Sequence, residues 1–217
     1  MNITRLLLLG AYGRTGNYLI QAALKKGYEV VVLIENPYHV DIYEEGLTVI
    51  YGTPYLIENI NKAIVGCHAV ISLLNKILEI EFAVINENRK VDFLERSMKN
   101  TLMAMEANKI KRIISLATVI FSDPQKQTIS VSSYLYSQEI FENGLSDHSK
   151  AELSIKNSSF DWTLVRVNGI TSKLSKKSTR TAVNSSAFVN REKLTDFILD
   201  VIKGHRYIQM DPLLASL

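Results

Sequence analysis

The sequence is poor in cysteine and in net charge. Cys67 is the only cysteine among 217 residues, which excludes an internal disulfide and a thiolate-rich metal site and is typical of a reducing compartment such as the cytosol. The 25 Lys and Arg residues nearly balance the 22 Asp and Glu residues, so the net charge of +3 is too small to indicate an extended nucleic-acid or membrane surface. We therefore expect a cytoplasmic protein with a small-molecule substrate, no nucleic-acid partner and no membrane partner.

Long apolar runs and ligand-spaced histidines are also lacking. No stretch reaches the roughly 18 apolar residues of a membrane span, and the run Leu6 to Leu9 ends at glycines and Arg14, unlike a secretory signal. There is no Gly-x-Ser-x-Gly nucleophile motif, which argues against hydrolysis. A metal site is not expected, because such sites need three or four converging ligands and the histidines show no ligand spacing. The four histidines are His39, His68, His148 and His205.

Short apolar runs alternate with longer helical patterns along the whole chain. We expect strands at Ile3 to Leu9, Glu29 to Ile34, Leu47 to Tyr51, Ala69 to Leu74, Arg112 to Ala117, Trp162 to Val167 and Tyr207 to Met210. Helices are expected at Arg14 to Lys26, Tyr55 to Val65, Asp92 to Asn108, Ser149 to Lys156 and Arg191 to Lys203. This alternation predicts an α/β fold, a doubly wound Rossmann-type parallel sheet of about seven strands with helices on both faces. The length suits a single domain over residues 1–217.

Three segments depart from this alternation. Asn75 to Lys90 is long for a loop and carries an alternating apolar pattern, which favours either an inserted flap or a subunit contact. The second alternative would make the protein a homodimer. Residues 123–147 include Tyr134 and Tyr136, which either face a substrate or half bury against the core, and end at Asn143-Gly144, a predicted helix end. A third segment, 171–186, is rich in Ser, Thr and Lys and is expected to be a loop. Its cations either attract an anionic substrate or form a solvated surface: Lys173, Lys176, Lys177 and Arg180.

Three glycines lie in the sequence GAYGRTG, between a predicted strand and a predicted helix. In a dinucleotide-binding turn, the first glycine (Gly10) permits the tight turn, the second (Gly13) lets a pyrophosphate approach the backbone, and the third (Gly16) lets helix and strand pack closely. The N–H groups of the helix N-terminus then receive the phosphate charge. The alternative is a glycine-rich turn without a ligand, which the flanking strand and helix make the weaker interpretation.

Glu35 closes the second predicted strand, about 19 residues after Gly16. An acidic side chain at this place can accept hydrogen bonds from the adenosine ribose hydroxyls. Its alternative is a solvated glutamate in the turn before Pro37. Because NADP carries a phosphate at the 2′ position, the charge of Glu35 slightly favours NAD(H) over NADP(H).

The chain resembles a known family through GAYGRTG, AVISLLN, RIISLAT and SSFDWTLVRVNGIT. These motifs are similar to those of atypical short-chain dehydrogenase/reductases of the NmrA-like and biliverdin/flavin reductase type, and the likeness runs from Ile3 to about Asp211. The resemblance implies NAD(P) across the carboxyl ends of the strands and a small substrate cap, here about 123–147 and 168–190. It also implies the cofactor-binding residues, which would be Gly10, Tyr12, Gly13, Arg14, Thr15, Gly16, Glu35, Leu73, Leu74, Asn75 and Thr118.

The chain also departs from that family. Members commonly carry an arginine after the second strand and an aspartate after the third, where this chain has Glu35 and Gly52-Thr53. The Tyr-x-x-x-Lys pair that performs acid/base chemistry in the wider superfamily is missing, and His148 stands at the lysine position. The resemblance implies Thr118 as a candidate catalytic residue, because it stands where such proteins often carry a hydroxyl facing the nicotinamide. His148 is the second candidate, as a proton donor near neutral pH, and is equally compatible with a surface position before a capping box at Ser149 to Glu152.

Two functions follow from this pattern. The first is an NAD(P)H-dependent oxidoreductase that transfers hydride to a flat acceptor such as a flavin or a quinone, a reaction in which a flavin can take its proton from water. The second is a non-catalytic NmrA-like sensor that binds the dinucleotide and reports its redox state to a protein partner. The missing Tyr-x-x-x-Lys pair is compatible with both, and the fold alone does not choose between them.

Overall fold

The computed structural model describes residues 3–11, 13–35, 44–75, 91–118, 138–167, 169–171 and 189–214. Its strands are β1 (Arg5–Leu9), β2 (Glu29–Ile34), β3 (Leu47–Tyr51), β4 (Ala69–Ser72), β5 (Arg112–Thr118), β6 (Asp161–Val167), β7 (Ile170–Thr171) and β8 (Val189–Asn190). Its helices are α1 (Arg14–Lys25), α2 (Ile57–Ala63), α3 (Phe93–Ala107), α4 (Gln138–Lys156) and α5 (Arg191–Lys203).

Six of the strands form one parallel sheet in the order β3-β2-β1-β4-β5-β6. The chain leaves β1 in one direction towards β2 and β3 and returns to the other side of β1 with β4, so the order reverses between β1 and β4. In sheets of this kind, ligands bind at the carboxyl ends of the strands beside that reversal. The predicted doubly wound α/β fold is confirmed.

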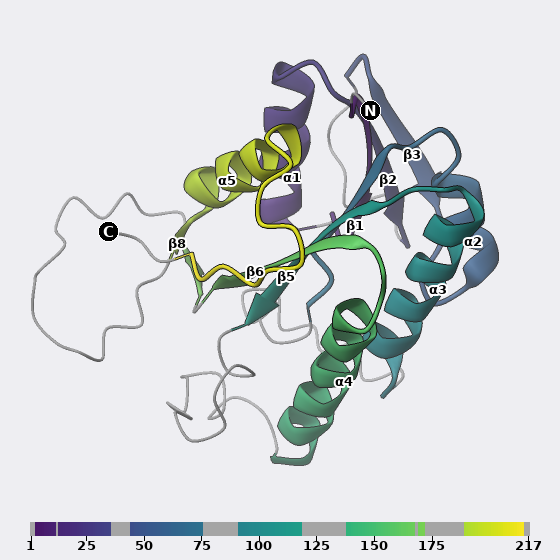
Figure 1. Cartoon of the computed structure of the whole chain (residues 1–217), viewed down its shortest axis with the longest axis vertical. Coiled ribbons are helices and arrows are strands. Elements are labelled where there is room, and N and C mark those ends of the chain that lie inside the picture. The colour runs from purple at the N-terminus through teal and green to yellow at the C-terminus, as the bar shows by residue number, and fades with distance from the viewer. Residues whose placement is uncertain are drawn as a thin grey trace, which may run out of the picture.

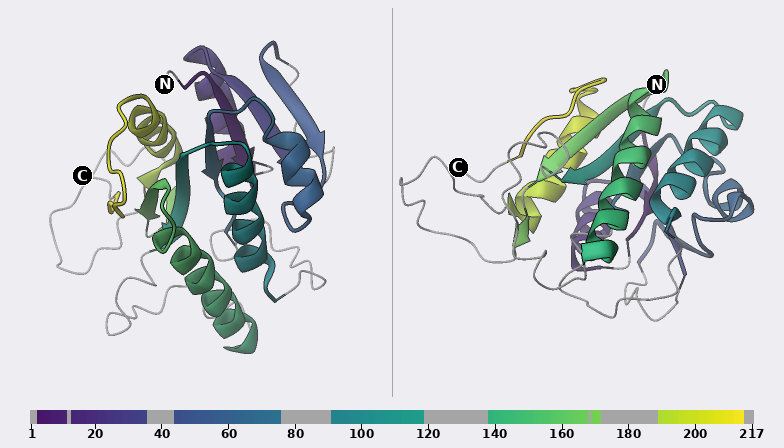
Figure 2. Two further views of the ribbon diagram at one scale, coloured as in Figure 1. Left: turned by 45° about the vertical axis from the view of Figure 1, so that its right-hand side comes forward. Right: turned by 90° about the horizontal axis from the view of Figure 1, so that it is seen from below.

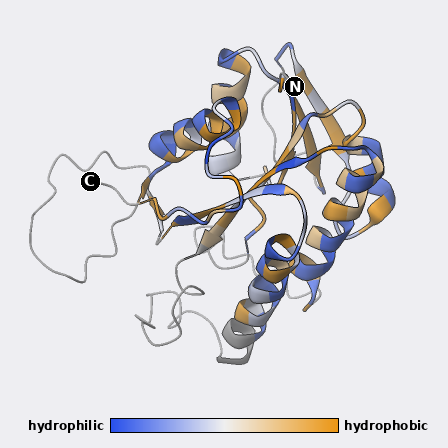
Figure 3. Cartoon of the chain, in the orientation of Figure 1, coloured by the Kyte–Doolittle hydropathy of each residue, from blue (hydrophilic) through white to orange (hydrophobic). Residues whose placement is uncertain are grey.

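Helices cover both faces of the sheet, and the side chains of β1 alternate between them. Leu6 and Leu8 belong to the core under α1 and α5, while Leu7 and Leu9 belong to the core under α2, α3 and α4. The views in Figures 1 and 2 show α1 beside α5 on one side and α2, α3 and α4 on the other. The strands are largely apolar, while the helices carry polar residues on their outer sides (Figure 3). Such near-continuous apolar strands are typical of a parallel sheet buried on both faces.

The seventh predicted strand, Tyr207 to Met210, runs along the outer edge of β6 without forming a regular strand. Parallel bridges join Thr163 to Met210 and Arg166 to Leu213. The backbone has left-handed φ angles of 46°, 56° and 54° at three alternate residues, which interrupts an extended ladder. These residues are His205, Tyr207 and Gln209. The main sheet therefore has six regular strands, close to the expected number.

Helix α4 corrects two predictions. It begins at Gln138 and continues through Asn143-Gly144, where a helix end was expected, and Ser149 lies inside it rather than in a capping box at its start. Local signals are outweighed here by burial, because Asp147, Ala151 and Ile155 recur on one face and pack inward. A glycine inside a helix costs only about 1 kcal/mol relative to alanine, which such packing offsets.

Asp147 of α4 caps the N-terminus of α3. Its Oδ2 accepts a hydrogen bond from the Leu94 N–H at 2.9 Å and its Oδ1 accepts one from the Glu95 N–H at 2.8 Å. The residue at the N-cap position itself, Asp92, makes no such side-chain bond. Because the carboxylate is buried, with 2% of the residue exposed, it satisfies helix N–H groups that water does not reach freely.

We expect Asp147→Ala to lower the free energy of unfolding by about 1 to 3 kcal/mol, because two helix N–H groups lose a charged acceptor. Urea denaturation measures this change. Asp92→Ala is the matched control and should cost less than about 0.5 kcal/mol. Equal losses in the two variants would show that the cap contributes nothing specific.

Candidate functional site: a glycine turn at the carboxyl ends of the strands

The turn between β1 and α1 passes very close to the segment that follows β4. Gly10 has a φ of 74°, and a Cβ added there would lie 2.8 Å from the Leu74 nitrogen and 2.9 Å from the Leu73 carbonyl carbon. Only glycine allows both the left-handed backbone and this approach. The structure therefore brings together two groups of predicted site residues, the glycine turn and Leu73 to Asn75, at the point where the strand order reverses.

Gly13 is the N-cap of α1 and leaves an open space above the helix N-terminus. Its backbone is extended (φ −104°, ψ 176°), and a Cβ added to it would meet no described atom within 4 Å. Glycine supplies no capping side chain, and no acidic residue occurs in the first turn of α1. The first N–H groups of this 12-residue helix and the positive end of its dipole are therefore suited to an anion such as a pyrophosphate.

Gly16 has the opposite surroundings. A Cβ at this position would overlap the backbone carbonyl of Ala11 in the turn before the helix. Gly16 is buried, so α1 packs directly on the turn that precedes it. The three glycines thus meet three different requirements, as the sequence motif predicts: a left-handed backbone at Gly10, open space at Gly13 and close packing at Gly16.

The other predicted site residues lie beside the glycine turn, at the start of α1 and at the ends of neighbouring strands. Arg14 is exposed and Thr15 is half-buried in the first turn of α1, and Glu35 is exposed directly after β2. On the other side of β1, the residues that follow β4 are buried, with 2% of Asn75 exposed. Thr118 is the last residue of β5, in register with Val167 of β6, and its backbone alone is described.

The turn after β3, which contains Gly52 and Thr53, is fastened to α3. The Thr53 hydroxyl accepts a hydrogen bond from the Tyr55 N–H at 3.3 Å, and Asn100 of α3 donates to the Tyr55 carbonyl at 2.9 Å. The guanidinium carbon of Arg96 lies 4.4 Å from the centre of the Tyr55 ring. Asn100 and Arg96 hold a turn at the carboxyl edge of the sheet, and no local sequence signal marks them because their partners lie more than 40 residues earlier.

His148 is buried, with 4% of the residue exposed, so the surface position considered for it is wrong. It lies in α4 and faces a cavity of about 20 Å³ that Ser115 and Leu116 of β5 also line. Those two residues precede Thr118 by three and two positions, so His148 packs against β5 close to its carboxyl end.

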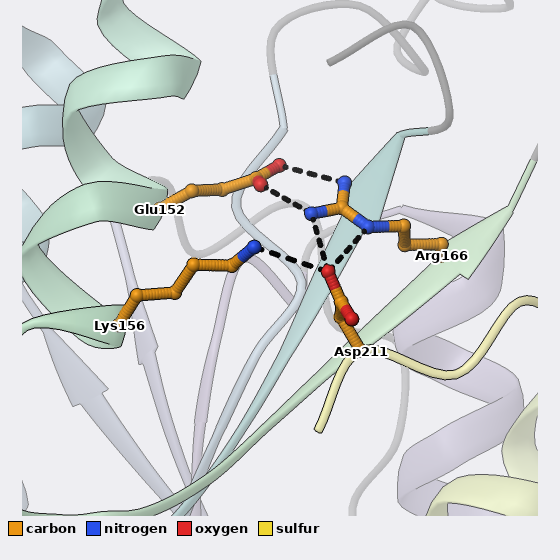
Figure 4. A network of polar contacts seen from close by, with 4 residues as sticks. All are labelled: Glu152, Lys156, Arg166 and Asp211. Carbon is orange, nitrogen blue, oxygen red and sulfur yellow. Dashed lines mark hydrogen bonds and ion pairs between the residues drawn. The ribbon is translucent and has the colours of Figure 1, made fainter. Parts of the chain in front are cut away.

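One turn further along α4, Glu152 belongs to a network of ionic contacts (Figure 4). Arg166 of β6 donates from Nη2 to the Glu152 Oε2 at 2.8 Å and to the Asp211 Oδ2 at 3.1 Å, and Lys156 Nζ lies 3.0 Å from the same Asp211 oxygen. The Arg166 side chain is 5% exposed and that of Glu152 12%, whereas Asp211 is 42% exposed. The network joins α4, β6 and the C-terminal segment.

The charge state of Asp211 depends on that network. Burial alone would raise the pKa of its carboxyl, but hydrogen bonds from Lys156 and Arg166 outweigh burial and lower the pKa below its usual value. A lowered pKa in the folded state means that the stabilisation is present above the unfolded pKa and is lost as the pH falls through the folded pKa. Acid therefore weakens the attachment of the C-terminal segment.

Several predicted features fall outside the described residues. They are Tyr12, Tyr134, Tyr136, the cationic loop residues Lys173, Lys176, Lys177 and Arg180, and residues 76–90 of the expected flap. Within the described ranges, no helix combines the length and apolar character of a membrane span. The same ranges contain no group of three or more His, Cys, Asp or Glu side chains placed to hold a metal ion.

The sequence matches the family model described as NAD(P)H-binding over residues 10–205, from the first glycine of the turn to just past the end of α5. The chain belongs to the NAD(P)H-binding family. This assignment confirms the family resemblance and the nicotinamide dinucleotide as its ligand. Among the curated proteins compared by sequence, none matches the chain.

Solved structures of three bacterial proteins share the fold. A putative epimerase from Bacteroides thetaiotaomicron has a TM-score of 0.74 and 16% identity, and the match covers 100% of this chain and 98% of that one. The anaerobilin reductase ChuY from Escherichia coli O157:H7 has a TM-score of 0.71 and 18% identity, with 98% of this chain and 97% of that one covered. A short-chain dehydrogenase/reductase from Veillonella parvula in complex with NADP has a TM-score of 0.71 and 14% identity, with 99% and 95% covered. At these identities the likeness shows the fold. Proteins with this fold thus include one described as a reductase and one described as a short-chain dehydrogenase/reductase.

Proposed function

We propose that this NAD(P)H-binding chain is an oxidoreductase that transfers hydride to a flat acceptor such as a flavin or a quinone. The observation that carries the proposal is the open space over Gly13 at the N-terminus of α1, a cradle that a Cβ would fill. When bound, the dinucleotide supplies the hydride. One structural neighbour, ChuY, is an anaerobilin reductase, which supports a reductase function for this chain.

The residues of this chain would divide the work between binding and proton supply. The N–H groups at the start of α1 would hold the pyrophosphate, Glu35 would accept hydrogen bonds from the adenosine ribose, and Leu73 to Asn75 would contact the ribose nearer the nicotinamide. Thr118, the last residue of β5, would lie near the nicotinamide. His148, buried beside β5, would hold the proton that the acceptor needs after it receives the hydride, so that NAD(P)H, acceptor and one proton would give NAD(P)⁺ and reduced acceptor.

The proposed organisation is a single NAD(P)-binding domain over residues 1–217 with a small substrate cap from about 123–147 and 168–190. Of the proposed cap, residues 138–147 form the first half of α4, and β7 pairs with β8 in a separate two-stranded sheet. We also propose that residues 75–90 contribute to the site or to a homodimer contact.

The second candidate function is an NmrA-like dinucleotide sensor without turnover. The missing Tyr-x-x-x-Lys pair is compatible with this function as well as with the first. Turnover separates the two functions: NADH and NADPH are each offered with FMN, FAD or a quinone in the absence of oxygen, and oxidation is followed by the loss of reduced-nicotinamide absorbance. We expect oxidation with at least one acceptor. Saturable binding of NADH without oxidation by any of these acceptors would favour the sensor.

We expect a preference for NADH over NADPH of roughly tenfold, about 1.4 kcal/mol. Glu35 is exposed at the end of β2, where a 2′-phosphate would meet its negative charge, while Arg14 in the first turn of α1 can partly compensate by a charge-assisted hydrogen bond. Calorimetric titration of both reduced cofactors into the wild type and into Glu35→Ala measures the preference. The ratio should fall towards one in Glu35→Ala. Tighter binding of NADPH by the wild type would refute the preference, and an unchanged ratio would remove Glu35 as its cause.

A further inference from the structure

The cavity beside His148 has a mixed lining. It lies between α3, α4 and β5, and six of its lining residues are apolar while three are polar. The polar residues come from two elements: Ser115 from β5, and His148 and Glu152 from successive turns of α4. Residues four apart on a helix lie on the same face, so His148 and Glu152 are presented to the cavity together.

The size and lining of this cavity suit one water molecule. A volume of about 20 Å³ exceeds the roughly 10 to 15 Å³ that one water needs, and buried waters are held by two to four polar partners. Empty cavities in proteins are apolar, whereas this one has three polar side chains that are largely buried. Beside Ser115 in register, the hydroxyl of Ser72 is also buried and has no hydrogen-bond partner among the described residues.

Glu152 is held rigidly enough to direct such a water. Both of its oxygens face Arg166, with Nη2 to Oε2 at 2.8 Å and Nη1 to Oε1 at 3.5 Å. A carboxylate has about four acceptor positions, so this pairing leaves acceptors for a further donor. The pairing of Glu152 with Arg166 (Figure 4) therefore fixes an anionic acceptor at the wall of the cavity that His148 shares.

We propose that the cavity holds one buried water that joins the Glu152 carboxylate and the Ser115 hydroxyl to the His148 ring, and that Glu152 is thereby a positioning residue for His148. A hydrogen bond to one imidazole nitrogen decides which nitrogen carries the proton and how the ring is oriented. The other nearby carboxylate on α4, Asp147, accepts hydrogen bonds from the N-terminus of α3. The effect on turnover rests on the proposed function, whereas the water and the ring tautomer do not.

The ring nitrogens of His148 provide a test that does not need activity. Nitrogen-15 NMR of the histidine rings is recorded at about pH 8, where a histidine of ordinary pKa is neutral, and the His148 signals are assigned by their loss in His148→Gln. We expect one dominant tautomer in the wild type and a shift towards a mixture in Glu152→Gln and in Ser115→Ala. Asp211→Asn is the matched control, since Asp211 also pairs with Arg166 but does not line the cavity, and it should leave the ring signals unchanged.

Ser115→Val keeps the proposal testable if Glu152→Gln does not fold, because it fills the cavity without touching the ion pair. It should displace the water and change the His148 signals in the same way. Unchanged signals in Ser115→Val, or an equal change in Asp211→Asn, would overturn the proposal. A high-resolution crystal structure of the full chain should show the water in contact with both Glu152 and Ser115, and a dry cavity would also overturn it.

Turnover supplies the functional readout. With the acceptor that the wild type reduces, Glu152→Gln should lower kcat about tenfold with an unchanged KM for NADH, whereas Asp211→Asn should change neither by more than about twofold. A rise in KM at constant kcat would show a role in cofactor binding and contradict the positioning role. If the wild type reduces no acceptor, the proposed function fails, and the NMR comparison still decides the water and the role of Glu152.

Discussion

Gly13→Val should abolish dinucleotide binding while the protein remains folded. A side chain at Gly13 would occupy the open space above the N-terminus of α1, where the pyrophosphate must approach the backbone. We expect the Kd for NADH to rise at least about 100-fold, which is about 2.8 kcal/mol. The backbone there is extended and meets no neighbour, so the only expected loss of stability is about 1 kcal/mol from a poorer N-cap residue. Calorimetric titration and urea denaturation measure the two effects separately.

Gly13→Ala should give an intermediate loss of affinity, because its methyl group fills less of the same space. Gly144→Ala is the control for removing a glycine that also has open space around its Cβ position but lies inside α4. It should bind NADH like the wild type. Wild-type affinity in a folded Gly13→Val variant would show that the pyrophosphate does not lie over this residue.

Gly16→Ala should have the opposite effect to Gly13→Val: it should destabilise the fold rather than block the ligand. Inside a helix, Gly→Ala ordinarily stabilises by up to about 1 kcal/mol. Here the new Cβ would overlap the backbone carbonyl of Ala11, which cannot rotate away as a side chain could, so α1 must shift from the turn. We expect a loss of about 3 kcal/mol or more in the free energy of unfolding.

Urea denaturation of Gly16→Ala beside Gly13→Ala measures this difference within one motif. Gly13→Ala should lose no more than about 1 kcal/mol. The sign of the change at Gly16 is decisive, because a gain in stability would mean that helix propensity dominates and that α1 does not pack on Ala11 as closely as described.

The sequence predicts those parts of the fold that local patterns control. Strands β2 and β3 have the expected bounds, because both are rich in β-branched residues and lie between polar turns. The glycine turn was also predictable, since Gly10 needs a left-handed backbone, Gly16 needs close packing and Gly13 leaves open space for a ligand. For these elements, local propensity and the tertiary structure agree.

Features that depend on distant contacts were not predictable. Asn143-Gly144 has the local character of a helix end, yet α4 continues because Asp147 binds the N-terminus of α3, 53 residues earlier, and because His148 and Ala151 are buried. For the same reason, the burial of His148 could not be predicted from the sequence alone. The ion pair between Glu152 and Arg166 of β6 was not predictable either, because no local pattern links the two residues. The expected seventh strand, Tyr207 to Met210, is not regular because two left-handed residues, Tyr207 and Gln209, interrupt it.

The most direct test of the dinucleotide site is a crystal structure of the whole chain with NADH bound. We expect the pyrophosphate within hydrogen-bonding distance of the N–H groups in the first turn of α1, over Gly13, and the adenosine ribose beside Glu35. A dinucleotide bound away from the β1–α1 turn, or crystals that take up no NADH at saturating concentration, would contradict this site.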